Sequence, residues 1–168
     1  MSQPMSAIIA KANDYRKTAN DKAYCHFEMS EAASQQNLRL GLIATILSTI
    51  VGTTIFAAIS KHGEKEQSNT AIAIQIVTGL MSVTAAVLAA LQTFFRFGDV
   101  SAQNKSAAVG YEKIKLSLDL FLLNYDPAST ETGKALEELK AIALDLEKIE
   151  DSSPSIPDSV YKKVVKKA

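Results

Sequence analysis

The chain has 168 residues, of which 18 are basic and 18 are acidic, so its formal net charge is zero. This length leaves room for one domain. The balanced charge, the absence of tryptophan and the lack of a basic face interleaved with aromatic residues argue against a nucleic-acid-binding protein. The four prolines and seven glycines lie mostly near the ends of apparent helices, which predicts an all-α fold.

The segment 5–39 is predicted to form one cytoplasmic helix. Small and apolar residues recur there at three- and four-residue steps, which gives one weak apolar stripe. The stripe consists of Ile8, Ala12, Tyr15, Ala19, Ala23 and Phe27. No proline or glycine separates this segment from the apolar run that follows, so we expect the helix to continue unbroken, with Arg39 at the membrane interface.

Two long runs without a charged residue follow this helix. Arg39 and Lys61 enclose 21 uncharged residues, and Glu66 and Arg96 enclose 29 more. As helices they would be roughly 31 Å and 43 Å long, against roughly 30 Å for the hydrocarbon core of a bilayer. We therefore predict a two-span transmembrane helical hairpin, with a first membrane helix at 40–60, an external loop at 61–70 and a second membrane helix at 71–95. The alternative, a buried soluble hairpin, would need far more chain to cover two helices that are apolar all round.

The basic residues near the ends of the two spans predict the orientation. On the terminal sides lie Lys22, Arg39, Arg96, Lys105, Lys113 and Lys115. The loop offers Lys61 and Lys65, which Glu64 and Glu66 offset. Because basic residues stay on the cytoplasmic side, both termini are expected to be cytoplasmic. The first apolar run begins at residue 40 and is too long for a signal peptide, so it should insert as a signal anchor.

On each predicted membrane helix the small and hydroxylated residues share one face, given about 100° of rotation per residue. On the first helix these residues are Gly41, Thr45, Ser48, Thr49 and Gly52, and on the second they are Gln75, Gly79, Ser82, Ala86, Ala89 and Thr93. The bulky residues opposite them are Ile43, Ile46, Leu47, Ile50 and Val51 on the first helix, and Ile76, Leu80, Val83, Val87, Leu91, Phe94 and Phe95 on the second.

Two interpretations of the small faces stay open. Small residues let helix backbones approach closely, so the faces could serve helix packing alone. In an assembly of several chains, Gln75, Ser82, Thr93 and the hydroxyls of the first span could instead line a water-filled path. No acid or base lies within either apolar core, which argues against a proton relay or a transporter of charged substrates.

The segment 96–168 is predicted to form a cytoplasmic helical bundle, with the second membrane helix continuing past Arg96. A strict stripe of four- and three-residue steps predicts a strongly amphipathic helix, packed on the N-terminal helix and ended by Asp126 and Pro127. Its members are Ala107, Tyr111, Ile114, Leu118, Phe121 and Tyr125. A further helix is predicted from near Ser129 or Thr130 to about Glu150, with a stripe of Leu136, Leu139, Ile142, Ala143, Leu146 and Ile149. A short last helix opens at Pro157, and its closing lysines could contact anionic lipid, cover the acidic helix before it or stay in solvent.

The chain lacks the patterns of the common catalytic sites. We find no nucleotide-binding loop, no nucleophile elbow, no pair of closely spaced cysteines and no zinc-protease motif. The single cysteine, Cys25, forms no intramolecular disulfide, and its neighbour His26 points about 100° away on a helix, so the two do not make a dyad. His62 lies alone in the loop. We therefore expect a protein that is not an enzyme and that needs no cofactor or metal.

The residues at the end of the second span resemble the SLATT family. The run Leu91-Gln92-Thr93-Phe94-Phe95 is similar to the end of that family's second membrane helix, and the whole stretch 79–97 shares its small-residue-rich character. Leu47, Ser48, Val51, Gly52 and Thr53 match a pattern of the family's first helix, and Ala107, Ala108 and Tyr111 match its later part. Asn104 stands where the family tends to carry a histidine, which puts the role of that position in doubt. The resemblance covers roughly residues 10–150. It implies that the whole chain, residues 1–168, is a single SLATT-like domain.

This resemblance implies a function. Members of the SLATT family are two-transmembrane effectors associated with bacterial nucleotide-second-messenger defence systems. The chain would be an effector of abortive infection that oligomerises in the bacterial inner membrane and opens a pore, killing the infected cell. The activating signal would come from a separate sensor protein or a nucleotide. The alternatives are a non-pore membrane adaptor that docks a soluble enzyme, and a holin-like lysis protein.

Overall fold

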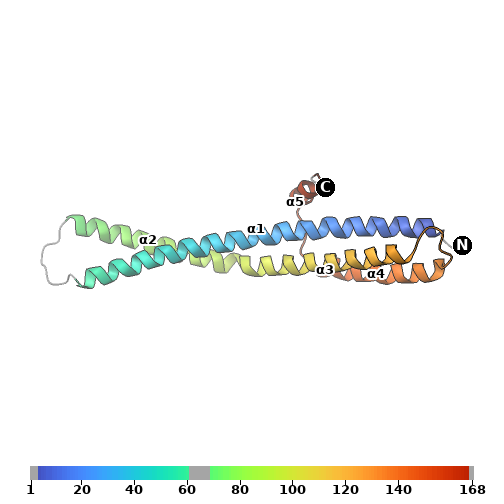
Figure 1. The fold of residues 1–168 in the computed structure, drawn as a ribbon. Helices are drawn as coiled ribbons and strands as arrows, with labels where there is room; N and C mark the ends of the chain where they lie inside the picture. The colour runs from blue at the N-terminus through green and yellow to red at the C-terminus, as the bar shows by residue number, and fades with distance from the viewer. Residues whose placement is uncertain (1–3, 61–68, 167–168) are drawn as a thin grey trace. The chain divides into compact units, whose positions relative to one another are not determined.

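The computed structural model describes residues 4–60 and 69–166, and it describes the burial of their side chains except at 55–60 and 69–72. The residues so described form five helices: α1 (Met5–Ser60), α2 (Asn69–Phe95), α3 (Phe97–Asn124), α4 (Thr132–Ser152) and α5 (Asp158–Val165) (Figure 1). Every regular element in the described ranges is an α-helix, so the all-α prediction is confirmed. Most of the predicted external loop, residues 61–68, lies outside the described residues, and so does His62.

The chain divides into two compact units. The bundle unit comprises Met1–Ala32 and Val100–Ala168, and the apolar pair comprises Ala33–Asp99. Helix α1 contributes to both units without interruption, which confirms the predicted continuation of the N-terminal helix into the apolar run. This follows from the absence of proline and glycine between Met5 and Leu40.

The predicted continuation of the second apolar helix past Arg96 is wrong. Helix α2 ends at Phe95, and Arg96 adopts a left-handed backbone conformation with φ of 46°, the only positive φ at a non-glycine residue in the described part of the chain. Its backbone N–H still donates to the Gln92 carbonyl at 3.2 Å, and its guanidinium pairs with the Asp99 carboxylate at 2.6 Å. Asp99 lies in the first turn of α3, where a carboxylate stabilises a helix start. The new helix therefore begins directly after the turn at Arg96.

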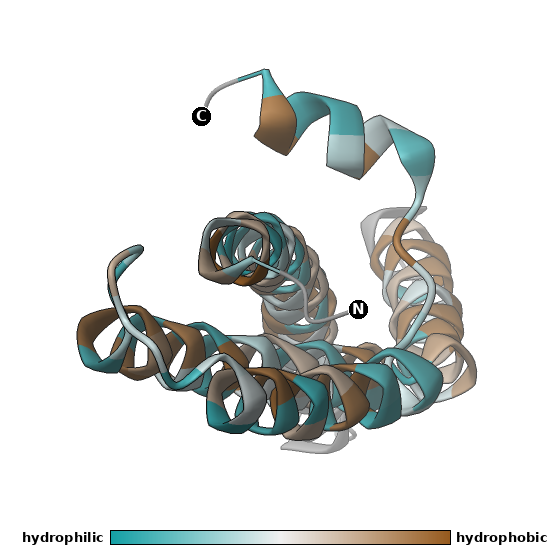
Figure 2. Ribbon diagram, turned by 90° about the vertical axis from the view of Figure 1, so that its right-hand side faces the viewer, coloured by the Kyte–Doolittle hydropathy of each residue, from teal (hydrophilic) through white to brown (hydrophobic). Residues whose placement is uncertain are grey.

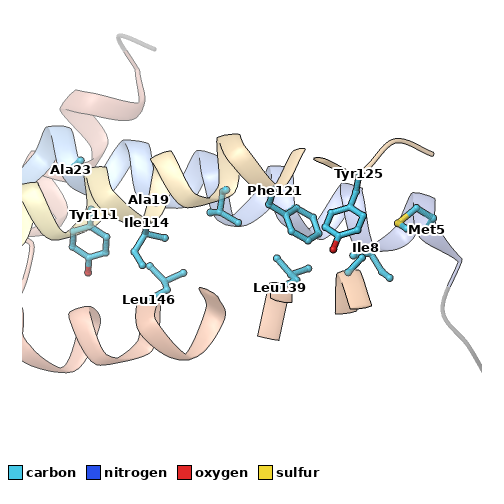
Figure 3. Packing of buried hydrophobic residues seen from close by; sticks show 13 residues of the cluster. Met5, Ile8, Ala19, Ala23, Tyr111, Ile114, Phe121, Tyr125, Leu139 and Leu146 are labelled. Atoms are coloured by element: carbon cyan, nitrogen blue, oxygen red, sulfur yellow. The ribbon is translucent and has the colours of Figure 1, made fainter. Parts of the chain in front are cut away.

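In the bundle unit α3 packs on the N-terminal part of α1 and on α4. All six residues of the predicted α3 stripe, from Ala107 to Tyr125, are buried, as are Ile8, Ala12, Ala19 and Ala23 of α1. Figure 3 shows the side chains of Phe121 and Tyr125 meeting those of this core, which Leu139 and Leu146 of α4 complete. Along these helices hydrophobic and hydrophilic residues alternate (Figure 2). The predicted α3–α1 seam is thus confirmed, while Tyr15 and Phe27 of the α1 stripe are only partly buried.

Exposed salt bridges connect the helices of the bundle unit at its surface. Arg16 of α1 pairs with Asp119 of α3, and Lys22 of α1 pairs with Glu150 of α4. The sequence allows three placements for the closing lysines, and Lys163 of α5 takes a fourth, because its ammonium pairs with the Glu28 carboxylate of α1 at 2.6 Å. Such exposed pairs each contribute little, about 0–1 kcal/mol. The fold of this unit therefore rests on the apolar core.

In the apolar pair, α1 and α2 meet along one seam on each helix. The α1 seam consists of half-buried residues that step by three and four, namely Asn37, Leu40, Ala44, Leu47, Val51 and Thr54, and the half-buried Gly41 and Gly52 lie beside it. The α2 seam consists of the buried Ala85 and the half-buried Thr78, Met81, Leu88 and Gln92. Gln92 Nε2 donates to Asn37 Oδ1 at 2.8 Å. Because Asn37 begins the α1 seam and Gln92 ends the α2 seam, the two helices run antiparallel.

Much of the apolar pair's bulky surface is exposed. Ile46, Leu80 and Val83 are at least half exposed, and Phe94 is 80% exposed. The chain thus has two helical stretches that are long and apolar enough to cross a membrane, with very little of either buried by the protein itself. An exposed apolar surface of this extent is typical of contact with lipid or with other chains.

Candidate functional site

Most residues of the predicted small faces lie outside the seams that join α1 to α2. Thr45, Ser48 and Thr49 are exposed, whereas Gly41 and Gly52 are half-buried. On α2 all of the predicted face is exposed, namely Gln75, Gly79, Ser82, Ala86, Ala89 and Thr93. The seams between the helices use other residues, and Leu47 and Val51, which the sequence placed among the bulky residues, belong to the α1 seam. Packing within one chain therefore accounts for Gly41 but not for the exposed residues of the small faces.

The two small faces open on the same side of the apolar pair. On each helix the centre of the small face lies about 110° around the helix axis from the centre of the seam. The rotation is in the direction in which the helix turns with increasing residue number. Because the helices are antiparallel, that direction runs clockwise on one helix and anticlockwise on the other when both are viewed from one end. One broad side of the pair is therefore small and hydroxylated on both helices, and the other side carries the bulky residues of both.

The glycines of these faces leave open space. A Cβ atom added to Gly52 or to Gly79 would meet nothing within 4 Å. At Gly41, in contrast, a Cβ atom would lie 3.3 Å from Gln92 Nε2. Gly41 thus permits a close approach within the chain, whereas Gly52 and Gly79 have room for a neighbour from outside it.

Threonine hydroxyls on these helices bond to their own backbone. Thr45 donates to the Gly41 carbonyl at 2.8 Å and Thr49 to the Thr45 carbonyl at 2.9 Å. On α2, Thr93 donates to the Ala89 carbonyl at 3.0 Å. These bonds satisfy the hydroxyl protons without water and leave the oxygens as acceptors on the surface. The small side is therefore compatible with dry helix packing as well as with a wet path.

A second polar site lies inside the bundle unit, where α1 meets α3. The His26 Nδ1 atom lies 2.9 Å from Asn104 Oδ1, and both side chains are fully buried. The Asn104 amide nitrogen donates to the Val100 carbonyl, so its oxygen faces the imidazole and His26 Nδ1 carries the proton. The His26 ring stacks on Tyr111 with a centroid distance of 5.5 Å. His26 Nε2 is buried and has no hydrogen-bond partner among the described residues.

One turn later on α1 and one turn earlier on α3, Ser30 and Ser101 form hydrogen bonds with each other. The Ser30 hydroxyl donates to the Ser101 carbonyl at 2.9 Å, and the Ser101 hydroxyl donates to the Ser30 carbonyl at 2.9 Å. This reciprocal pair satisfies two hydroxyls at a close helix–helix contact. Together with His26 and Asn104 it forms a ladder of polar contacts, which fixes the register of α1 against α3.

The sequence prediction missed this ladder because it followed apolar residues alone. Ala23, His26, Ser30 and Ala33 continue the spacing of the α1 stripe in steps of three, four and three. Asn104 likewise lies three residues before Ala107, the first predicted member of the α3 stripe. Polar residues at seam positions were the available signal. The position where the resemblance predicts a histidine thus holds the asparagine that binds His26.

Two groups near this ladder have altered acidity. Burial, and then the Asp21 and Glu28 carboxylates, raise the pKa of the Cys25 thiol. Burial raises the pKa of the Tyr111 phenol, against the opposing effects of a hydrogen bond with Ser153 and of the Lys22 charge. Cys25 is therefore a protonated, buried and unreactive thiol at neutral pH. In the described part of the chain no three potential ligands gather in a way that could hold a metal ion.

Comparison with protein-family models, with curated proteins and with solved structures found no match to this chain.

Proposed function

We propose that the chain is a membrane effector that assembles through the small side of its apolar pair and opens a pore there. The observation that carries this proposal is that both small faces lie on one side and that, apart from the half-buried Gly41 and Gly52, their residues are exposed. A chain with lipid-compatible residues on one side and small hydroxylated residues on the other suits a ring of copies, with bulky sides outward and small sides inward. Two apolar stretches of spanning length support membrane insertion.

The biological setting of the proposal comes from the resemblance to the SLATT family. In that setting the protein lies in the bacterial inner membrane with both termini in the cytoplasm. A separate sensor protein or nucleotide signal of the same anti-phage defence system triggers it, and the opened pore depolarises the membrane and kills the infected cell. The resemblance of residues 91–95 to the end of that family's second membrane helix supports this setting.

The threonine bonds favour a second candidate function. Because Thr45, Thr49 and Thr93 satisfy their hydroxyl protons within their own helices, the small sides could pack dry in an assembly that conducts nothing. The chain would then be a membrane adaptor that docks a soluble enzyme. A holin-like lysis protein is a third candidate, and the genes encoded beside the chain would distinguish it.

The proposal is tested in cells that carry the chain with its neighbouring genes, by following membrane potential and growth during phage infection. Gly79→Leu and Ser82→Leu fill the small side, and Gly79 has open space around it, so the single chain should fold and insert as before. These variants should lose depolarisation and growth arrest. Val83→Leu, one residue away on the bulky side, is the matched control and should keep both. Arrest without depolarisation would favour the adaptor, and full toxicity of the small-side variants would refute the proposed mechanism.

A further inference from the structure

Helix α5 packs on the face of α1 that points away from the core of the bundle unit. In Figure 1 α5 lies on one side of α1, and α3 and α4 lie on the other. The Lys163 ammonium of α5 pairs with the Glu28 carboxylate of α1 at 2.6 Å. Glu28 lies about 160° around α1 from His26, which faces α3. Asp21, seven residues before Glu28 on the same face, is also buried, so this face of α1 is acidic.

The contact that holds α5 on α1 is small. In the described part of the chain α5 buries one side chain, that of Val164, against three on α4 and seven on α3. Both partners of its salt bridge are more than one third exposed, so the pair contributes little. The residues 153–157, which include two prolines, join α5 to α4 without a helix. A helix with so few buried contacts detaches more readily than the helices of the core.

The outward surface of α5 combines an apolar edge with a basic one. Tyr161 and Val165, one turn apart, are 41% and 40% exposed. Lys162 and Lys166 follow them about 100° further around the helix and are exposed as well. We name these four residues the α5 outer face. The one acid of α5, Asp158, lies at the other end of the helix. An aromatic and aliphatic edge beside a lysine edge is typical of a helix that lies on a membrane surface.

The charges of the α5 outer face are unmatched within the bundle unit. Neither Lys162 nor Lys166 forms a salt bridge with a described residue, whereas Lys163 on the inner side is paired with Glu28. An anionic lipid surface attracts lysines, and each lysine near that surface strengthens the binding. The two outer lysines therefore gain anionic partners at a lipid surface that α1 does not give them. A surface that favours one of two positions in this way shifts the helix toward it.

Helix α5 is held within reach of the predicted membrane interface. Glu28, to which it is bound, precedes Arg39 by eleven residues on the unbroken helix α1, which is about 17 Å along the helix axis. A linker of five residues, 153–157, spans about 17 Å when extended. The headgroup layer occupies about 5–8 Å beyond the hydrocarbon core. A released α5 can therefore lie on the headgroups while α4 stays in place.

We propose that α5 exchanges between α1 and the anionic lipid surface of the membrane, which its outer face binds. The helix is then a latch on the bundle unit, and the lipid composition sets how often the latch is open. Opening frees the Glu28 carboxylate and the acidic face of α1. This inference rests on the membrane insertion in the proposed function, and it adds a lipid-binding surface that the pore itself does not use.

Tryptophan fluorescence of the full chain in vesicles tests the exchange. The chain has no tryptophan, so Tyr161→Trp gives a single reporter on the α5 outer face. The vesicles consist of phosphatidylcholine alone or with an equal amount of phosphatidylglycerol, and both carry a lipid with a nitroxide quencher at the headgroup. Fluorescence should be quenched in the anionic vesicles and not in the neutral ones. Equal quenching in both, or quenching in neither, would overturn the proposal.

Two charge variants in the Tyr161→Trp background test which lysines bind the lipid. Lys162→Gln with Lys166→Gln leaves the contact with α1 intact and should lower the ratio of lipid-bound to α1-bound α5 about 30-fold. Lys134→Gln with Lys148→Gln removes the same charge from α4 and should leave the ratio unchanged. Quenching that survives the loss of Lys162 and Lys166 would contradict the assignment of the outer face.

Two neighbouring valines distinguish exchange from lipid binding by a fixed α5. Val164 is buried and Val165 is exposed on the outer face. Val164→Ala weakens the contact with α1 and should raise the lipid-bound ratio about tenfold. Val165→Ala weakens the contact with lipid and should lower the ratio. A change in the same direction for both valines would contradict the exchange.

Efflux measured in the same vesicles separates this inference from the proposed function. If the anionic vesicles quench the fluorescence and no vesicle leaks, the lipid contact stands and the pore is wrong. If the vesicles leak, Ser82→Leu abolishes the leak and no quenching occurs, the pore stands and the lipid contact is wrong. A chain that alkaline extraction removes from the vesicles would overturn both.

Discussion

Replacing Asn104 by alanine tests whether the buried polar ladder holds the bundle unit together. The change removes the acceptor of the His26 Nδ1 proton, which lies 2.9 Å away in a site where both side chains are fully buried. A buried donor that loses its partner costs about 1–3 kcal/mol. His26 Nε2 already lacks a described partner, so the imidazole of the variant would have no hydrogen bond at all. The fraction of molecules in which this region is open should rise about 5- to 150-fold.

Cys25 provides the assay. It is the only cysteine of the chain, it is fully buried, and it adjoins His26. When opening is fast relative to the reaction, the labelling rate by a thiol reagent follows the population of the open form. Asn104→Ala should therefore accelerate Cys25 labelling about 5- to 150-fold at neutral pH. Gln103→Ala, an exposed neighbour on the same helix, should leave the rate unchanged.

A second variant distinguishes a lost hydrogen bond from lost packing. Replacing both partners, His26→Leu with Asn104→Leu, removes the polar groups together and should label more slowly than Asn104→Ala, because no donor is left unsatisfied. If Asn104→Ala labels within twofold of the unchanged protein, the ladder does not stabilise the bundle unit.

Three further outcomes follow from the same contacts. Phe121→Ala, at a fully buried core position, should lower the free energy of unfolding of the bundle unit by about 3–5 kcal/mol, measured by denaturant titration in mild detergent. Burial raises the pKa of Tyr111 above its usual value of 10.0, so the folded state holds the phenol proton more tightly than the unfolded state. The stability that this proton contributes is complete at pH values below the usual pKa and declines as the pH rises through the pKa of the folded state. Tyr111→Phe should therefore reduce the loss of thermal stability at alkaline pH. Gly41→Leu, whose Cβ would press on Gln92, should lower the thermal stability of the detergent-solubilised protein, whereas Gly79→Leu should not.

The bundle unit was largely predictable because its sequence contrasts apolar with charged positions. The α3 stripe from Ala107 to Tyr125 was predicted in full, since charged residues occupy most of the other faces. The polar ladder was not, because His26 pairs with Asn104 and Ser30 pairs with Ser101, so these polar side chains occupy seam positions that usually hold apolar ones.

The apolar pair was less predictable because nearly every residue in it is apolar or small. Without a polar reference face, the sequence grouped Leu47 and Val51 with the bulky side, although they form the seam with α2. The small faces were found, but only the structure separates them from the seam. The break at Arg96 had no clear signal, because a left-handed residue is expected to be glycine and the nearest one, Gly98, lies two residues later.

Efflux of potassium or dye from liposomes that contain the full chain distinguishes a pore from a sealed assembly. We expect efflux that rises steeply with the protein-to-lipid ratio. Val83→Leu should preserve this efflux and Ser82→Leu should abolish it, although both variants insert to the same extent. Liposomes that stay sealed at every protein density, or an equal leak from the Ser82→Leu variant, would contradict the proposed pore.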